Sequence, residues 1–170
     1  MEKSKTGKLV LETGREFKGI RYGSGGNHVG EIIFNTTMVG YQEIISDPAY
    51  AGQIVVMTYP LMGQYGITDE DFEARSSYLE GLIVRECCEA PSNFRYTKTL
   101  SEELEEHNVP CLAGLDTRML TRIIREKGSM KAAIVDEDMP LEDALKLIRD
   151  TQMPTDYVSR VSCKKRWFSR

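Results

Sequence analysis

Residues 29–50 read VGEIIFNTTMVGYQEIISDPAY. This stretch predicts a strand that is followed by a short helix. The run Glu31-Ile32-Ile33-Phe34 predicts a strand over residues 28–35. A short helix is expected at residues 40–46, and it ends at Asp47-Pro48 because the proline ring disfavours helical geometry at the residue before it. A buried strand should follow at residues 53–59, which are β-branched and apolar.

On the amino-terminal side, two short runs predict a β-hairpin. Residues 8–12 and 16–22 flank Thr13-Gly14-Arg15, and glycine supplies the positive φ that such a turn needs. Residues 23–27 are rich in glycine and form a flexible connection to the strand at residues 28–35. These three strands are therefore expected to form an antiparallel meander.

On the carboxyl-terminal side, a surface loop at residues 63–72 is expected to precede alternating strands and helices. The pattern Thr99-x-x-Glu102 has the spacing of a capping box and begins a helix. Strands are expected at residues 81–85, 111–115 and 130–135, and helices at 99–107, 116–128 and 140–148. The last two helices are predicted from apolar faces, formed by Met119, Leu120, Ile123 and Ile124 and by Leu141, Ala144, Leu145 and Ile148.

The expected fold class is mixed α/β, with an antiparallel β meander followed by β/α units. Residues 1–150 are predicted to form one domain, and residues 151–170 a tail or the start of a linker. The tail has no clear period and ends in the basic and aromatic string KKRWFSR at residues 164–170. A solvated end or a severed linker is favoured over an RNA or membrane contact.

The charge balance argues against nucleic acid or an anionic membrane as the main partner. The 170 residues contain 22 Lys and Arg and 26 Asp and Glu, which gives a net charge of −4. The amino terminus lacks the apolar region of a signal peptide, and no apolar stretch is long enough to cross a bilayer. A cytoplasmic location with reduced thiols is therefore expected.

The sequence contains no evident active-site motif. The chain has neither a complete dinucleotide-binding glycine motif nor a phosphate-binding P-loop. The cysteines form no C-x-x-C pair, and none has the two flanking glycines of a nucleophile elbow. Both histidines, His28 and His107, lack metal-spaced neighbours and are interpreted as structural. We therefore expect no catalytic residue and no metal site in this chain.

Three arginines form one candidate interaction surface. Arg118, Arg122 and Arg125 stand at i, i+4 and i+7 of an expected helix, so they lie on one face. This face is either solvated or an interface, because arginines at that spacing can form bidentate pairs with carboxylates of a partner.

Four strings in the same order give the chain a family resemblance. These are residues 29–50, QIVVMTYPLMGQYG at 53–66, EAPSNFR at 89–95 and GLDTRMLTRIIREKG at 114–128. Together they closely resemble the N-terminal domain of the small, glutamine-hydrolysing subunit of carbamoyl-phosphate synthetase, over about residues 8–163.

The resemblance implies a swivelling β/β/α fold and a non-catalytic role. In the family, a second half of the subunit is a glutaminase domain whose Cys–His–Glu triad releases ammonia, and that half is expected to be absent here. The large subunit uses the ammonia with bicarbonate and two ATP to make carbamoyl phosphate for pyrimidine and arginine synthesis. The implied partner is thus the large subunit, and the ATP and metal ions belong to it, with no cofactor in this chain.

The resemblance also implies one position near the glutamine pocket. The family has a serine in the string D-P-S-Y that reaches this pocket, and Ala49 stands at the matching position in Asp47-Pro48-Ala49-Tyr50. Without a hydroxyl, this position can contribute only through its backbone or its shape. A second departure is Met119, where the family pattern usually has lysine, and it makes the arginine helix less basic.

Three hypotheses follow for the function. The leading one is the non-catalytic N-terminal domain of the synthetase small subunit, present as a truncated form or a shortened gene product, which serves assembly and supports the glutaminase site. The alternative is an independent protein-binding module on the same fold. A stand-alone enzyme ranks last because the sequence offers no candidate nucleophile, base or metal cluster.

Overall fold

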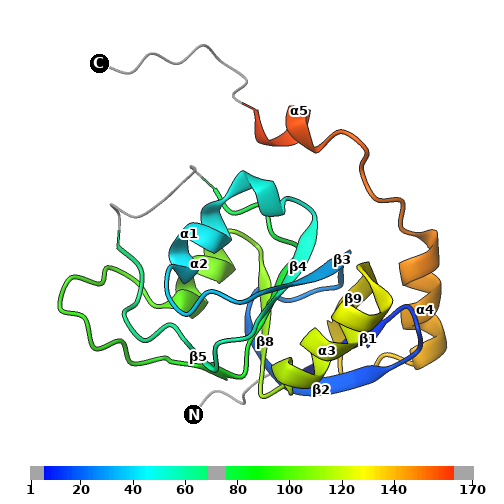
Figure 1. Ribbon diagram of the computed structural model, residues 1–170, viewed down its shortest axis with the longest axis horizontal. Helices are drawn as coiled ribbons and strands as arrows, with labels where there is room; N and C mark the ends of the chain where they lie inside the picture. Colours follow the sequence, from blue (N-terminus) through cyan, green and yellow to red (C-terminus); the bar gives the residue numbers. More distant parts are fainter. Residues whose placement is uncertain (1–5, 69–75, 163–170) are drawn as a thin grey trace.

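The computed structural model describes residues 6–68 and 76–162, which form nine strands, five α-helices and one 3₁₀ turn (Figure 1). The strands are β1 (Thr6–Leu11), β2 (Glu16–Gly23), β3 (His28–Asn35), β4 (Gln53–Met57), β5 (Leu61–Met62), β6 (Gly81–Ile83), β7 (Glu86–Cys87), β8 (Pro110–Ala113) and β9 (Met130–Asp136). The helices are α1 (Tyr41–Ser46), η1 (Pro48–Tyr50), α2 (Leu100–Glu106), α3 (Thr117–Lys127), α4 (Leu141–Asp150) and α5 (Tyr157–Val161).

Seven of the strands close into a mixed β-barrel in the order β1-β2-β8-β6-β4-β3-β9. Four neighbouring pairs are antiparallel, and the pairs β3–β4, β4–β6 and β6–β8 are parallel. The mixed α/β class is therefore confirmed, and so is the predicted hairpin, because β1 and β2 pair antiparallel from Thr6↔Ile20 to Val10↔Glu16.

The predicted antiparallel meander is wrong at its third strand. β3 does not pair with β2, whose second edge is bonded to β8 through Ile20↔Ala113. β3 pairs instead with β9 in the antiparallel sense and with β4 in the parallel sense. The helix α1 explains the parallel pair, since two parallel neighbours need a crossover connection and α1 supplies it between β3 and β4.

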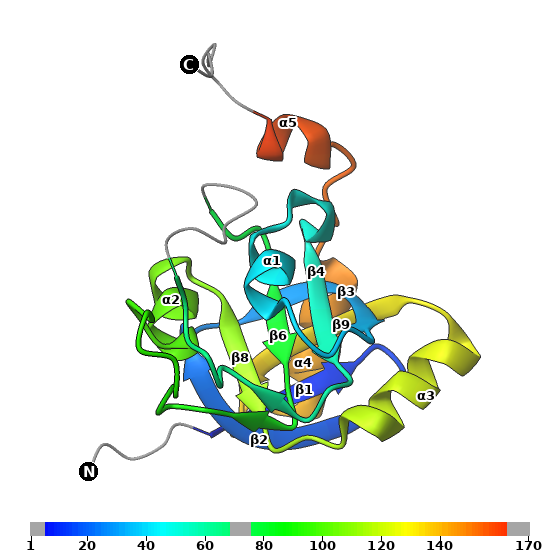
Figure 2. The ribbon, with the colours of Figure 1, turned by 60° about the vertical axis from the view of Figure 1, so that its left-hand side comes forward.

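The barrel interior is filled by residues that alternate along every strand. Leu9 and Leu11 of β1 point inward with Ile32 of β3, whereas Val10 between them points outward. Successive side chains of a strand point to opposite faces, so this alternation separates one interior cluster from the outer surface. The amphipathic helix α3 adds Leu120, Ile123 and Ile124 to the interior cluster, and it lies at one side of the barrel in Figure 2.

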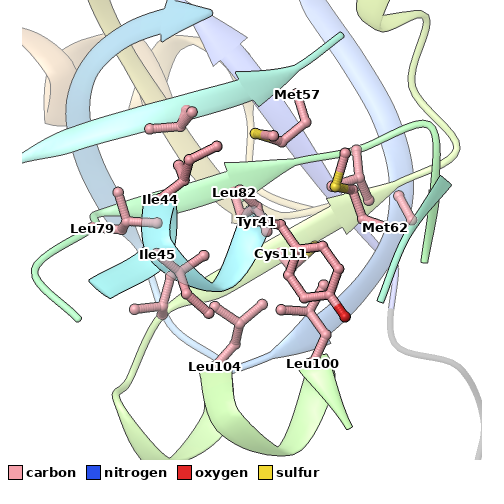
Figure 3. Close-up of a cluster of buried hydrophobic side chains, with 14 of the residues drawn as sticks. Tyr41, Ile44, Ile45, Met57, Met62, Leu79, Leu82, Leu100, Leu104 and Cys111 are labelled. Atoms are coloured by element: carbon pink, nitrogen blue, oxygen red, sulfur yellow. The ribbon is translucent and has the colours of Figure 1, made fainter. Parts of the chain in front are cut away.

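Two outer surfaces of the barrel are covered by helices. On one wall, α1 and α2 bury Tyr41, Ile45 and Leu104 against the outward residues of β4, β6 and β8 (Figure 3). On another wall, α4 buries Ala144 and Ile148 against β1 and β9. The expected apolar faces of the last helices are thus confirmed at these positions, apart from Met119.

The stretch expected as a surface loop is partly buried where the structure describes it. Ile67 is 1% exposed and bridges to Lys98, and the Tyr41 hydroxyl donates to the Gly66 carbonyl at 2.6 Å. Tyr41 also stacks on Tyr65, with ring centroids 4.2 Å apart. Residues 69–72 lie outside the described residues.

The expected tail contains a helix that its sequence did not predict. The Asp156 carboxylate accepts a hydrogen bond from the Ser159 amide at 3.0 Å and caps α5. The basic string at residues 164–170 lies outside the described residues. None of the described helices combines the length and the apolar character that a membrane crossing requires.

Candidate functional site

The arginine helix α3 is held firmly at both ends and along its buried side. The Asp116 carboxylate accepts a hydrogen bond from the Met119 amide at 2.9 Å, and the Gly128 amide donates to Ile124 at the other end. Met119 itself is 40% exposed, which corrects its expected place on the apolar face. It stands next to the fully buried Leu120, and consecutive residues of a helix point in directions about 100° apart.

The three arginines of α3 are exposed to solvent, as their spacing predicts. Within residues 6–68 and 76–162, none of Arg118, Arg122 and Arg125 forms an ion pair with a carboxylate. Arg125 lies over the ring of Phe34, with its guanidinium carbon 5.7 Å from the ring centroid. The anchored helix therefore presents exposed guanidinium groups that can pair with the acidic groups of another molecule.

Ala49 lies at an exposed turn between α1 and β4. The Asp47 carboxylate caps this turn by accepting a hydrogen bond from the Ala49 amide at 2.8 Å. The neighbouring Tyr50 hydroxyl accepts a hydrogen bond from the Asn35 side chain at 3.0 Å, which fixes the turn against β3. The exposed methyl group of Ala49 thus sits on a rigid surface feature.

The structure does not bring Ala49 and the arginines together. The turn η1 follows α1, which packs on the outer wall of the barrel, whereas α3 packs its apolar side into the interior cluster. In Figure 2 the labels α1 and α3 mark separate parts of the molecule. Any partner that contacts both surfaces must therefore extend around the barrel.

A cavity of about 250 Å³ lies beside the turn that carries Ala49. Ala51 and Gly52 line it from the turn, and Arg160 lines it from α5. The remaining lining residues come from three other segments: His28, Ser77, Tyr78, Leu79, Glu80, His107 and Asn108. The histidines are not isolated from carboxylates, because His28 lies 3.8 Å from Glu80 and His107 lies 2.7 Å from Glu103.

A larger cavity of about 810 Å³ lies beside the barrel strands β1, β2 and β9. Four of its five charged residues form two ion pairs. Arg21, whose side chain is 3% exposed, donates to Asp136 at 2.6 Å and to the Gly26 carbonyl. Lys18 pairs with Glu137 at 2.9 Å. Burial lowers the pKa of Arg21, and the pairing with Asp136 opposes this shift. The lining holds two cations and, with Asp138, three carboxylates, so two ion pairs leave a surplus of one negative charge at this cavity.

The cysteines that the structure describes are free thiols. Cys111 is fully buried and packs as a small residue in the core. A thiol hydrogen bond between Cys111 and Cys87 raises the pKa of Cys111, as does burial, and it lowers the pKa of Cys87. In the described part of the chain, no group of three or more His, Cys, Asp or Glu side chains could hold a metal ion. Cys163 lies outside this part.

Comparison with known proteins gives the family. Residues 9–134 match the model of the carbamoyl-phosphate synthase small chain, CPSase domain. The chain belongs to this family. It is 50% identical over 157 residues to the pyrimidine-specific small chain of Bacillus subtilis and 53% identical over 157 residues to the small chain of Bacillus caldolyticus. Both alignments cover 92% of this chain and 43% of the relative.

A relative from Fusobacterium nucleatum, also a carbamoyl phosphate synthase small chain, is 46% identical over 156 residues. The alignment covers 44% of the length of that relative. The chain thus spans less than half the length of the small chains that it matches. The family assignment rests on the part that these proteins share with it.

Sequence reasoning missed the side chains that the fold gathers around the smaller cavity. The spacing of Glu103 and His107, four residues apart on one helix, was a signal for their pairing. No sequence signal placed Ser76, Glu80 or Arg160 near them, because these residues come from segments that only the barrel brings together.

Proposed function

We propose that this chain acts as the N-terminal, non-catalytic part of a carbamoyl-phosphate synthase small chain. In this role it assembles with the large chain and supports the site where glutamine is hydrolysed. The whole synthase would make carbamoyl phosphate from glutamine, bicarbonate and two ATP, in the cytoplasm, for pyrimidine and arginine synthesis. The observation that supports this proposal most strongly is the match of residues 9–134 to the family's N-terminal domain.

The closed barrel with its outer helices supports the finer proposal that the fold is the family's swivelling β/β/α domain. The large chain would hold the ATP and the metal ions. Within this chain, the contribution to the synthase would lie in surfaces rather than in chemistry on glutamine.

We assign the face of Arg118, Arg122 and Arg125 to the contact with the large chain. Three features favour this assignment: the arginines are exposed, they lack carboxylate partners within the described residues, and α3 is anchored in the barrel. An exposed guanidinium loses less freedom on binding when its helix is already fixed, so the face is suited to a specific contact.

Ala49 would border the glutamine pocket from outside. Its amide is already used by Asp47, and its side chain is a methyl group, so it can contribute shape but no hydroxyl hydrogen bond. The exposed position of the turn leaves it accessible to another domain.

The test combines a binding assay with an activity assay. The chain is immobilised and exposed to the large chain from the same organism, and glutamine hydrolysis by the chain alone is measured in parallel. We expect capture of the large chain and no release of ammonia from glutamine. Measurable glutamine hydrolysis by these 170 residues would overturn the non-catalytic role.

The alternative function is an independent protein-binding module on the same fold. The replacement of the family serine by Ala49 is the observation that favours it. A correctly folded chain with no affinity for the large chain would support this alternative and contradict the assembly role.

A further inference from the structure

Three side chains form a hydrogen-bonded chain, and the middle one, His107, lines the smaller cavity. The ring nitrogen Nε2 of His107 lies 2.7 Å from Oε1 of Glu103, and the other ring nitrogen, Nδ1, lies 3.1 Å from the hydroxyl of Ser76. A nucleophile within hydrogen-bond reach of a base, with the base oriented by a third group, is the general arrangement of hydrolases with a serine nucleophile. Here the hydroxyl faces Nδ1 and the carboxylate faces Nε2, which is the reverse of the Ser-His-Asp template.

The carboxylate of Glu103 fixes which ring nitrogen carries the proton. Glu103 is 3% exposed and accepts from Nε2, so Nε2 bears the hydrogen and Nδ1 is left as the acceptor. With the imidazole neutral, Nδ1 at 3.1 Å is the nearer of two acceptors for the Ser76 hydroxyl, and the Ser77 carbonyl oxygen at 3.4 Å is the other. The Lys98 ammonium lies 3.7 Å from the second oxygen of Glu103 and partners its buried charge.

The end of α2 holds His107 in place. His107 is the C-cap residue, and Asn108 follows it in the left-handed region with φ 57°. The amide of Asn108 donates to Glu105 and that of Val109 donates to Leu104 at 2.8 Å, which together make a Schellman motif. Leu104 and Val109 are buried in the same outer cluster, so the position of the base is set by the core.

The adjoining cavity can accept a small substrate. His107 lines it, together with Ser77, the neighbour of Ser76, and Arg160. Its volume of about 250 Å³ suits a short acyl group rather than a large ligand. The Arg160 guanidinium lines this cavity, and a guanidinium is one kind of group that can stabilise negative charge on a carbonyl oxygen.

We propose that Ser76 is a nucleophile activated by His107 and oriented through Glu103, and that it hydrolyses small acyl esters. Ser76 Oγ forms a bond to the acyl carbon while its proton passes to His107 Nδ1. The carbon–oxygen bond to the alcohol then breaks, and the alcohol leaves with that proton. Water attacks the acyl group on Ser76, gives a proton to Nδ1, and releases the carboxylic acid as Ser76 regains its hydrogen.

This activity is separate from the proposed assembly function. It uses neither the arginine face nor Ala49, and its substrates are esters rather than glutamine. The binding and glutamine assays described above can therefore fail or succeed independently of it.

The test uses a fluorophosphonate probe on the intact chain, with the labelled residue located by mass spectrometry, and hydrolysis of p-nitrophenyl acetate as a second readout. We expect one label on Ser76 and its loss in Ser76→Ala. The exposed Ser129 gives the matched control, because Ser129→Ala removes a hydroxyl outside the cavity and should keep full labelling.

The role of the base is tested by its pH profile. The labelling rate of the unsubstituted chain should rise with pH in a single step, and His107→Gln should lower the rate about 100-fold and remove the step. Glu103→Gln should lower the rate while its circular dichroism spectrum stays that of the parent. Labelling of Ser76→Ala as fast as the parent, or no labelling of a folded parent chain, would overturn the proposal.

Discussion

At the residue scale, Gly52 shows how one position ties distant parts of the chain together. Gly52 has φ 76°, in the left-handed region, and a Cβ built on it would lie 2.3 Å from the hydroxyl oxygen of Tyr157 in α5. The contact joins the turn beside Ala49 to a helix more than one hundred residues later. Sequence reasoning could predict a glycine turn here, but it could not predict a partner that only the folded barrel brings near.

Gly52→Ala should therefore displace α5 as well as strain the backbone. Gly14→Ala is the matched control, because Gly14 has φ 86° and an added Cβ would meet no atom within 4 Å. Both variants should lose about 1–2 kcal/mol of unfolding free energy from the left-handed backbone. Only Gly52→Ala should also speed hydrogen exchange at the amides of α5. Equal exchange at α5 in the two variants would contradict the packing of Tyr157 on Gly52.

At the element scale, capping and amphipathic patterns predicted the helices well. Thr99 and Glu102 form the expected capping box, with the Thr99 amide donating to the Glu102 carboxylate at 2.8 Å. The strands β5 and β7 were not predicted, since two residues each are too few for a period. The face of α3 was predicted except at Met119, an apolar residue that the helix geometry leaves on its exposed side.

The capping box gives a pH prediction for α2. The hydrogen bond from the Thr99 amide, together with that from its hydroxyl, lowers the pKa of Glu102 below its ordinary value of 4.5. A carboxyl group with a lowered pKa stabilises the fold above the pKa of the unfolded chain, and this contribution is lost as pH falls through the folded value.

Glu102→Gln should accordingly make the free energy of unfolding depend less on pH in the acidic range. Urea unfolding of the parent and the variant should differ at pH 7, and the difference should shrink as the pH falls below about 4.5, the ordinary value. Because other carboxylates titrate in the same range, the relevant quantity is the difference between the two proteins. A difference that stays constant from pH 7 to pH 3 would show that the capping carboxylate is not coupled to folding.

The packing of α3 predicts unequal effects of two neighbouring truncations. Leu120 is fully buried in the interior cluster, so Leu120→Ala should cost about 2–5 kcal/mol of unfolding free energy. Met119→Ala removes a side chain that is 40% exposed and should cost less than about 1 kcal/mol. Urea denaturation of the two variants measures both values. A larger loss for Met119→Ala would mean that α3 is rotated relative to the barrel.

At the scale of the whole molecule, sequence patterns could not predict that the strands close into a barrel. The sequence patterns placed Leu9, Ile32 and Ile54 correctly on strands, and these three side chains are buried in the interior cluster. The patterns do not say which strand lies beside which. The pairing of β2 with β8 joins residues about ninety positions apart, and the local hairpin beside it suggested a simple meander instead.

The same limit applies to the candidate surfaces. The spacing of the arginines predicted a common exposed face on α3, and the structure places them there. The role of the arginines and that of Ala49 depend on the residues of a partner, which the sequence of this chain does not contain. The pairing of His107 with Ser76, by contrast, needed the fold, because a loop after β5 and the end of α2 meet only in the closed molecule.

The proposed assembly of this chain with a carbamoyl-phosphate synthase large chain is tested by the dissociation constant of that complex. It is measured by sedimentation for the parent chain, for Arg118→Glu with Arg122→Glu, and for the matched control Lys146→Glu with Arg149→Glu on α4. We expect a complex for the parent, at least about tenfold weaker binding for the α3 variant, equivalent to about 1.4 kcal/mol, and nearly unchanged binding for the control. A folded parent chain that forms no complex, at concentrations where a full-length small chain saturates the large chain, would overturn the proposed assembly role.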